Sequence, residues 1–163
     1  MRILAIDPGP TESAWVLYEG DRRSRPCNEA IVRFAKQPNA DVLETIRAGA
    51  DRLVIEKIAC YGMAVGAEVF ETCVWTGRFM EVFGADRVDR IERLKVKLHL
   101  CHDSKAKDAN IRAALIDRLG TPGTKKIPGP TYGIAGDVWS ALAVAVTWAD
   151  SPAYWMARNG GGA

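Results

Sequence analysis

The sequence predicts an α/β fold, a mixed five-stranded sheet flanked by helices. Three short strands follow one another at the start, and two later strands alternate with helical segments. Consecutive strands joined by turns pair antiparallel, whereas strands separated by helices pair parallel. The 163 residues, of which 48% are hydrophobic, are enough for one domain with a core of its own.

The first three strands are predicted at Arg2–Asp7, Ser13–Glu19 and Ala30–Ala35. The first is a compact apolar run, and the second alternates between two faces, as a half-buried strand does. Gln37-Pro38-Asn39 then interrupts the chain, and Asn39 is the expected N-cap of a helix that reaches Gly49.

Four further elements complete the predicted fold up to the last loop. A strand is expected at Arg52–Glu56, a helix at Ala67–Phe83, a short strand at Val88–Leu94 and a helix at Lys105–Leu119, with Gly120 as its stop. Helical spacing in the first helix places these residues on one apolar stripe: Val69, Phe70, Cys73, Val74 and Met80.

The last part of the chain contains a loop and a very apolar helix. Residues 120–136 are rich in Gly and Pro, which predicts a loop. The final helix has no charge between Asp137 and Asp150, so it should be buried nearly all round. We therefore expect one domain over residues 1–150 and a C-terminal tail at 151–163.

The composition predicts a cytoplasmic protein with reduced thiols. The longest apolar run, Val138–Ala149, is too short for a membrane span, and the first residues begin a strand where a signal peptide would have an apolar leader. A chain of this size needs no disulfides. The Cys101-His102 pair is only a weak zinc signal. The other cysteines are Cys27, Cys60 and Cys73.

The net charge of +2 is unevenly distributed. Residues 77–126 carry 12 Lys and Arg against 7 Asp and Glu, a net charge of +5, whereas the rest of the chain carries 10 against 13, or −3. A polyanion is the natural partner of such a basic segment. Charge alone fits a solvated helical face equally well, so that alternative stays open.

Three acids each stand at the end of an apolar element. Asp7 ends the first strand, Glu56 ends the fourth, which we place parallel and adjacent to the first, and Asp137 opens the final helix. Functional groups gather at the carboxyl ends of parallel strands. Clustered carboxylates repel unless a cation holds them, and a hard divalent ion does this well. Taken singly, the acids also fit a turn, an exposed strand end and an N-cap.

Three motifs resemble the RuvC-type Holliday-junction resolvases of the RNase H-like superfamily, particularly their phage-encoded branch. "AIDPG" at Ala5–Gly9, followed by "SAWVLYEG", is similar to the family's first hairpin. "LVIEK" at Leu53–Lys57 is similar to its second acidic strand, and "ALAVAVT" at Ala141–Thr147 to its last helix. The similarity spans residues 2–149 and implies an RNase H-like fold.

The resemblance implies a homodimeric endonuclease that cuts branched DNA, such as a four-way junction, with Mg²⁺ or Mn²⁺ and leaves a 5′-phosphate. Asp7, Glu56 and Asp137 match the family's acidic positions as catalytic residues and metal ligands, with two ions per site and Asp7 between them. The family's further Asp in the last helix is replaced by Ser140. A hydroxyl is a poor substitute for a carboxylate, so the second ion site is weak or another acid completes it; Asp103 and Asp150 are candidates.

Basic and aromatic residues of the chain are candidates for DNA contacts. Lys107 is the candidate for transition-state charge, and Tyr61 occupies the region where the resolvases stack an aromatic side chain on junction bases. The alternative for Lys107 is a solvated position at a helix start, and the alternative for Tyr61 is packing in the core. His102 fits an ordinary surface histidine. The remaining candidates for phosphate contacts are Lys105, Arg112, Lys125 and Lys126.

Two other function classes stay open at the level of sequence. Nucleotide-binding proteins of the actin-like or sugar-kinase type also begin with a strand, an Asp and a Gly-containing hairpin, but they need two such halves and a longer chain. The second class is a junction-binding scaffold with weak or no cleavage. It is motivated by the replacement of the family's acid by Ser140.

Overall fold

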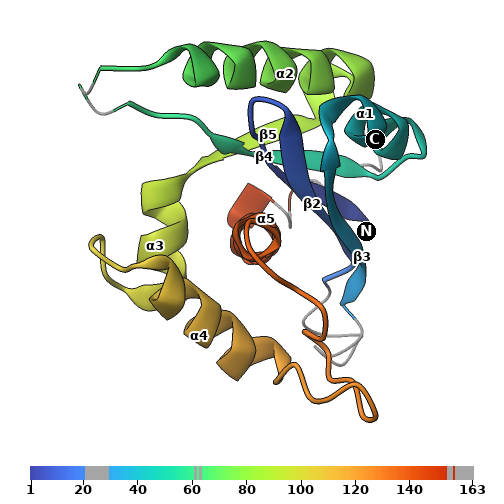
Figure 1. Ribbon diagram of the computed structural model, residues 1–163, viewed down its shortest axis with the longest axis vertical. Coiled ribbons are helices and arrows are strands. Elements are labelled where there is room, and N and C mark those ends of the chain that lie inside the picture. Colours follow the sequence, from blue (N-terminus) through green and yellow to red (C-terminus); the bar gives the residue numbers. More distant parts are fainter. Residues whose placement is uncertain (21–29, 61, 63, 154–155, 157–163) are drawn as a thin grey trace.

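In the computed structural model the chain forms three layers, with a central sheet between two groups of helices (Figure 1). The structure describes residues 1–20, 30–60, 62, 64–153 and 156. Helices α1 (Asn39–Arg47) and α2 (Ala67–Phe83) cover one face of the sheet. Helix α5 (Val138–Ala149) covers the other face, with α3 (Arg93–Cys101) and α4 (Asp108–Leu119) packed outside it.

The sheet is mixed and has five strands in the order β3-β2-β1-β4-β5, which confirms the predicted fold class. The strands are β1 (Ile3–Asp7), β2 (Glu12–Tyr18), β3 (Ile31–Pro38), β4 (Arg52–Lys57) and β5 (Val88–Glu92). Strands β1, β2 and β3 form an antiparallel meander, while β4 runs parallel to both β1 and β5. The predicted neighbourhood of the first and fourth strands is therefore correct.

Alternation along β1 and β4 divides the core into two halves. Leu4 and Ile6 face α1 and α2, whereas Ile3 and Ala5 face α5. Because side chains alternate between the faces of a strand, Asp7 continues the α5 side of β1. Glu56 follows Val54 in the same way on β4, which places both acids beside the start of α5.

Helix α1 begins at Asn39, the residue predicted to be its N-cap, so the helix starts one residue earlier than predicted. Pro38 is the N-cap, and Asn39, predicted to be the cap, is the first helical residue and is buried. Its side chain is used elsewhere: Ser13 Oγ donates to Asn39 Oδ1 (2.6 Å), and Asn39 Nδ2 donates to the Gly9 carbonyl (3.0 Å). Asn39 therefore ties the start of α1 to the turn that follows Asp7.

Helix α2 has the predicted bounds but presents much of its apolar stripe to solvent. Phe70 is 61% exposed and Val74 is 57% exposed, and Cys73 is also exposed. The residues of α2 that face the sheet are Thr72, Thr76, Phe79 and Phe83. The two threonines can be buried there because the hydroxyl of each donates a hydrogen bond to the carbonyl four residues earlier.

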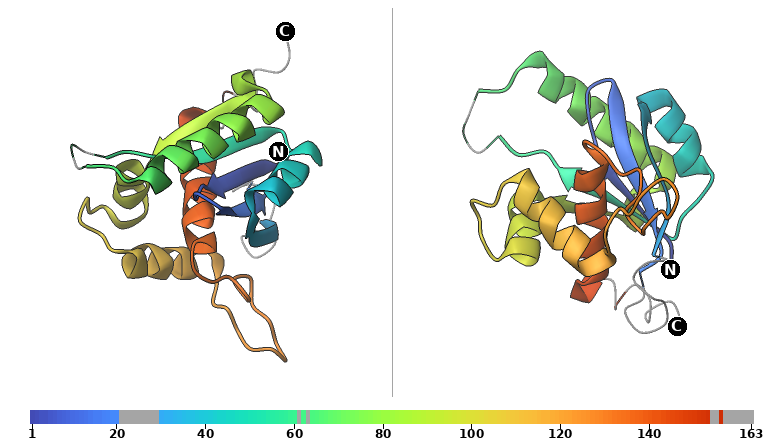
Figure 2. Two further views of the ribbon diagram at one scale, coloured as in Figure 1. Left: turned by 45° about the horizontal axis from the view of Figure 1, so that its top comes forward. Right: turned by 60° about the horizontal axis from the view of Figure 1, so that its bottom comes forward.

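The segment after β5 differs from its prediction. A strand was expected up to Leu94, but β5 ends at Glu92 and a helix, α3, begins at once with Arg93. The next helix, α4, starts at Asp108 rather than at Lys105. Lys107 is its N-cap, and the Lys107 amide donates to Asn110 Oδ1 (2.9 Å). Figure 2 shows α3 and α4 next to each other, joined by a loop.

Helix α5 is the centre of the larger core half, as its lack of charge predicts. Every residue from Val138 to Ala149 is buried except Ser140, which is partly buried. Among the described residues, no helix is both long and apolar enough to cross a membrane. Cys60, Cys73 and Cys101 are free thiols as predicted, and Cys27 lies outside the described residues.

Candidate active site

Asp7 lies at the end of β1, where the following turn requires a glycine. A Cβ on Gly9 would lie 2.3 Å from the carbonyl oxygen of Glu12, a separation that no side chain can tolerate. The Gly9 amide donates to Ser13 Oγ (3.1 Å), and Asn39 accepts a hydrogen bond from that hydroxyl. This network fixes the turn and with it the direction of the Asp7 side chain.

Glu56 and Asp137 approach Asp7 from neighbouring elements. Ile6 of β1 is paired with Ile55 of β4, so the residues that follow, Asp7 and Glu56, are neighbours at one edge. Asp137 is the N-cap residue of α5 but makes no side-chain capping hydrogen bond. It pairs instead with Lys36 of β3, whose Nζ lies 2.7 Å from Asp137 Oδ2. The three acids from distant parts of the sequence thus gather at one sheet edge.

The pKa of Asp7 is shifted by its burial and by the two neighbouring acids. Burial raises the pKa of Asp7 to about 7, and the negative charges of Glu56 and Asp137 contribute to the same rise. The charge of Arg93 and a hydrogen bond from Ser140 lower it in part. Burial also raises the pKa of Glu56, against the lowering effect of Arg93. A carboxylate with a pKa raised by its acidic neighbours lies in a field that attracts a cation.

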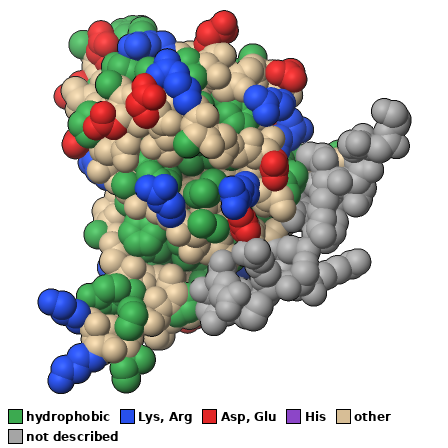
Figure 3. Space-filling view, turned by 90° about the vertical axis from the view of Figure 1, so that its right-hand side faces the viewer, with side chains coloured by type: hydrophobic (Ala, Val, Ile, Leu, Met, Phe, Trp, Pro, Cys, Tyr) green, Lys and Arg blue, Asp and Glu red, His purple; other side chains and the backbone are tan. Residues whose placement is uncertain are grey.

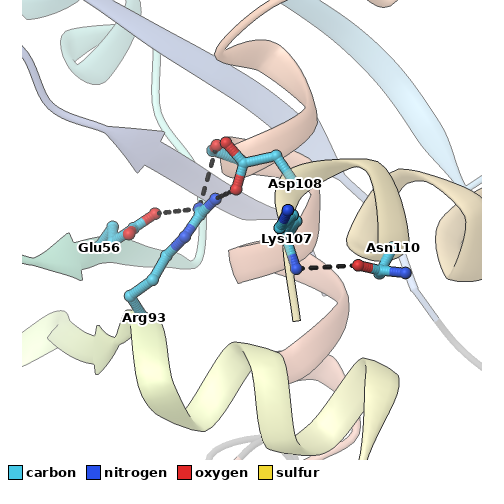
Figure 4. A network of polar contacts seen from close by, with 6 residues as sticks. Glu56, Arg93, Lys107, Asp108 and Asn110 are labelled. Carbon is cyan, nitrogen blue, oxygen red and sulfur yellow. Dashed lines mark hydrogen bonds and ion pairs between the residues drawn. The ribbon is translucent and has the colours of Figure 1, made fainter. Parts of the chain in front are cut away.

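Arg93 joins the acids through a fork of hydrogen bonds (Figure 4). Its Nη1 donates to Glu56 Oε2 (3.2 Å) and to Ser140 Oγ (3.1 Å), and its Nη2 donates to Asp108 Oδ1. Glu56 is only 14% exposed, so the exposed-strand-end alternative is wrong for it. The guanidinium therefore links β4, α4 and α5.

Two cavities meet at Arg93. One, of about 230 Å³, lies on the sheet side and is lined by Asp7, Glu56 and the chain that follows each of them. The other, of about 540 Å³, lies between α4 and α5. Its lining includes Asp108, Arg112, Asp137, Trp139 and Ser140. Arg93 lines both cavities, and Ser140 of the larger cavity hydrogen-bonds to Asp7 of the smaller one, so the two cavities share one set of polar residues.

The donor chemistry suits one hard divalent cation. Carboxylate oxygens are the ligands that Mg²⁺ prefers, and Asp7, Glu56 and Asp137 supply them. Within the described part of the chain, however, no three Asp, Glu, His or Cys side chains are drawn together closely enough to hold a metal ion. Lys36 and Arg93 instead pair with two of the acids. The three-carboxylate metal site stays a prediction.

Ser140 stands where the family has its fourth acid, and it contacts Arg93. Ser140 is partly buried and accepts a hydrogen bond from Arg93. Neither suggested substitute acid stands there. Asp150 caps the opposite end of α5, where Arg118 and His99 hold it, and Asp103 accepts a hydrogen bond from the Lys105 amide. The acid that does reach this region is Asp108.

The basic candidates lie on the α4 side of the molecule. Lys105, Lys107, Lys125 and Lys126 are exposed. The guanidinium of Arg112 lies 5.2 Å from the ring centroid of Trp139, beside the larger cavity. The loop that carries Lys125 and Lys126 projects beyond the rest of the domain (Figures 1 and 2). Tyr61 lies outside the described residues, so its role stays a prediction.

Sequence reasoning missed three residues of the site, namely Lys36, Arg93 and Asp108. Lys36 had a usable signal, because Asp7 pairs with Ala14 and Ala14 pairs with Lys36 across the antiparallel meander. Residues in register across neighbouring strands share a face. The contacts of Arg93 and Asp108 depend on the position of α3, and residues 93–101 carry no helical pattern of apolar residues.

Comparison with known proteins supports the fold. No family model and no curated protein matches the chain. Solved structures do match it: Thermus thermophilus RuvC aligns with a TM-score of 0.63 at 20% identity, over 98% of this chain and 97% of RuvC. The chain has the RuvC-type, RNase H-like fold.

Two further RuvC-fold structures were determined with DNA. T. thermophilus RuvC in complex with a Holliday junction substrate aligns with a TM-score of 0.66 at 17% identity, covering 91% of this chain and 93% of RuvC. Fowlpox virus resolvase in complex with substrate Holliday junction DNA aligns with a TM-score of 0.55 at 16% identity, covering 91% of this chain and 96% of the resolvase. At these identities the likeness establishes the RuvC fold and no more.

Proposed function

We propose that the chain is a structure-selective endodeoxyribonuclease that cuts four-way junctions and related branched DNA with Mg²⁺ or Mn²⁺. The observation that carries the proposal is the convergence of Asp7, Glu56 and Asp137 at one edge of a RuvC-type sheet. Solved neighbours of this fold include two resolvases in complex with Holliday junction DNA.

Phosphodiester hydrolysis requires an activated water in line with the leaving oxygen and compensation for negative charge on the phosphoryl group. A bound divalent cation supplies both. The chain contributes the carboxylates that would hold it: Asp7 interacts with the charges of both other acids, Glu56 and Asp137. Burial at the sheet edge restricts water around Asp7, which strengthens its interaction with a cation.

The basic face that would hold the DNA backbone adjoins this site. Arg112 of α4 lines the larger cavity, and Lys107 directly precedes that helix. The projecting loop of residues 120–136 extends the face with Lys125 and Lys126. Figure 3 shows Lys or Arg side chains at the projecting lower end of the face in view, and mixed charges above. Phosphate contacts of this kind select shape rather than base sequence.

Cleavage of a labelled four-way junction tests the proposal. Wild type is expected to make paired, symmetric nicks only with Mg²⁺ or Mn²⁺ and to leave a linear duplex of the same sequence uncut. Asp7→Asn should lower the cleavage rate by about 1,000-fold or more while junction binding persists. Asp117→Asn, an exposed acid on α4, is the matched control and should cut as wild type does. Undiminished cutting by Asp7→Asn would exclude this active site.

A junction-binding scaffold without cleavage is the second candidate function. Two observations favour it: the replacement of the fourth acid by Ser140, and the pairing of Glu56 with Arg93. It predicts tight binding to the four-way junction and no nicks with either metal. The same assay decides between the two, because binding and cleavage are read on the same labelled DNA.

We further propose that the chain acts as a homodimer through the exposed side of α2. Phe70 and Val74 lie one helical turn apart and form an apolar patch with the exposed Cys73. Two opposed strands of a junction call for two sites related by a twofold axis. Wild type should sediment as a dimer, and Phe70→Ser with Val74→Ser should sediment as a monomer whose nicks are no longer paired. A wild type that is monomeric at micromolar concentration excludes the dimer.

A further inference from the structure

Arg93 lies among the acids of the site. Its guanidinium contacts Glu56, Ser140 and Asp108 at the same time, and Arg93 lines both cavities of the site. Its charge also reaches Asp7, whose pKa it lowers. The contacts come from three elements, β4, α4 and α5, so the guanidinium is oriented by the fold rather than by one neighbour.

The side chain opposite Arg93 suits a guanidinium and not a metal ion. Ser140 offers a neutral hydroxyl, which accepts a hydrogen bond from Nη1 at 3.1 Å. A hydroxyl gives a divalent cation little of the charge that a carboxylate would give. A metal ion placed beside Ser140 would also lie against the fixed positive charge of Arg93. The residues present therefore do not fit a second ion at this position.

The charges of the site balance with one divalent ion. When a cation is bound, Asp7 is ionised, and the site then has four carboxylates, on Asp7, Glu56, Asp108 and Asp137, of which two are matched by Lys36 and Arg93. The remaining double negative charge equals that of one Mg²⁺ or Mn²⁺ in magnitude. A second ion would leave the protein site with excess positive charge before any DNA is bound.

We propose that the site takes a single divalent cation, held by Asp7 with its acidic neighbours, and that the guanidinium of Arg93 supplies the second positive charge to the phosphate being cut. This inference rests on the proposed nuclease function. Arginine suits the role because its planar fork binds phosphate oxygens in pairs and stays charged. The contacts of Arg93 within the described chain leave Nε and one hydrogen of Nη2 for that purpose.

Metal stoichiometry tests the inference independently of cleavage. Titration of Mn²⁺ into the metal-free full chain, followed by calorimetry and by the Mn²⁺ electron paramagnetic resonance signal, is expected to give one ion per chain. Asp7→Asn should abolish that binding. The double variant Arg93→Ala with Ser140→Asp should bind two ions, because it removes the fixed cation and restores the carboxylate. Two Mn²⁺ ions per wild-type chain, or none, would overturn the inference.

Cleavage rates of Arg93 variants complete the test. In single-turnover cutting of the four-way junction, Arg93→Ala should be about 100-fold slower than wild type, and Arg93→Lys should lose less because it keeps the charge. Arg90→Ala, an exposed arginine on β5, is the matched control and should cut at the wild-type rate. A wild-type rate for Arg93→Ala would exclude the role in charge compensation.

The two proposals fail in different ways. If wild type binds one Mn²⁺ but cuts no branched DNA, the nuclease function is wrong while the single-ion site stands. If wild type cuts the junction and binds two ions, the function stands and the single-ion site is wrong. In the second case Asp108 is the acid that would complete the second site, and Asp108→Asn should return the stoichiometry to one.

Discussion

The two ends of helix α5 carry acids in opposite electrostatic situations. At the C-terminal end, Asp150 is 4% exposed and lies between Arg118, which contacts both carboxylate oxygens, and His99 Nε2 at 2.7 Å. At the N-terminal end, acids outnumber the cations that hold them. The ends are roughly 18 Å apart, at about 1.5 Å per residue for the 12 residues of α5.

The difference shows how charge balance separates a structural cluster from a candidate site. An acid held by an arginine fork is satisfied and needs no ligand, so burial of Asp150 fastens α5 to α3 and α4. A surplus of buried acids costs stability unless something positive arrives. The helix thus carries one end where the acid is balanced by cations and one end where acids outnumber them.

The largest expected effect on stability comes from removing Asp150, the acid at the C-terminal end of α5. Asp150→Ala removes both hydrogen bonds between Arg118 and this buried carboxylate, so the free energy of unfolding should fall by about 3 kcal/mol. Asp137→Ala at the other end should change it by less than about 1 kcal/mol, since its pair with Lys36 is exposed. Urea unfolding followed by circular dichroism measures both. Equal losses would show that the two ends do not differ.

A smaller effect should appear in the pH dependence of stability without metal. The folded pKa of Asp7, about 7, lies above the value of 3.8 expected for the unfolded chain. Between these values the folded state binds more protons, so stability should fall as pH rises from 4 to 7 and level off above. The decline from this group should be about 2 to 4 kcal/mol.

Asp7→Asn should remove this decline because an amide does not titrate. Unfolding of both proteins in a chelator, measured at intervals across the same pH range, gives the comparison. Asp117→Asn should keep the wild-type slope, since that acid is exposed on α4. If the free energy of unfolding of Asp7→Asn falls with pH as steeply as that of wild type, Asp7 is ionised throughout this range and burial does not raise its pKa.

The sequence was sufficient for the parts of the site that regular elements position. The apolar run ending on Asp7 specified the end of β1, and the run ending on Glu56 specified β4 to within one residue, since that strand ends at Lys57. The order of elements made the two strands neighbours. The uncharged run after Asp137 specified a buried helix that starts at the same edge. These residues are determined by local pattern and by sheet topology, which a single sequence carries.

The cations of the site were not predictable in this way. Residues 93–101 alternate apolar and polar side chains, the pattern of a strand, yet they form α3 because Val96 and its neighbours pack against the core beside α5. Tertiary packing overrides the local pattern there. Arg93 is the first residue of that helix, so its contact with Glu56 depends on where α3 packs.

The smallest expected effect concerns the exposed partner of Asp137. Lys36 and Asp137 are 46% and 55% exposed, so their ion pair contributes little to folding, but it competes with a metal ion for the same carboxylate. Lys36→Ala should tighten Mn²⁺ binding by about two- to fourfold, the amount that a pair of this kind is worth. Arg47→Ala, which breaks an exposed pair with Glu44 on α1, removes the same charge far from the sheet edge and should leave Mn²⁺ affinity unchanged. An unchanged affinity in Lys36→Ala would place Asp137 outside the metal site, and the negative surplus at the start of α5 would then rest on Asp7, Glu56 and Asp108 alone.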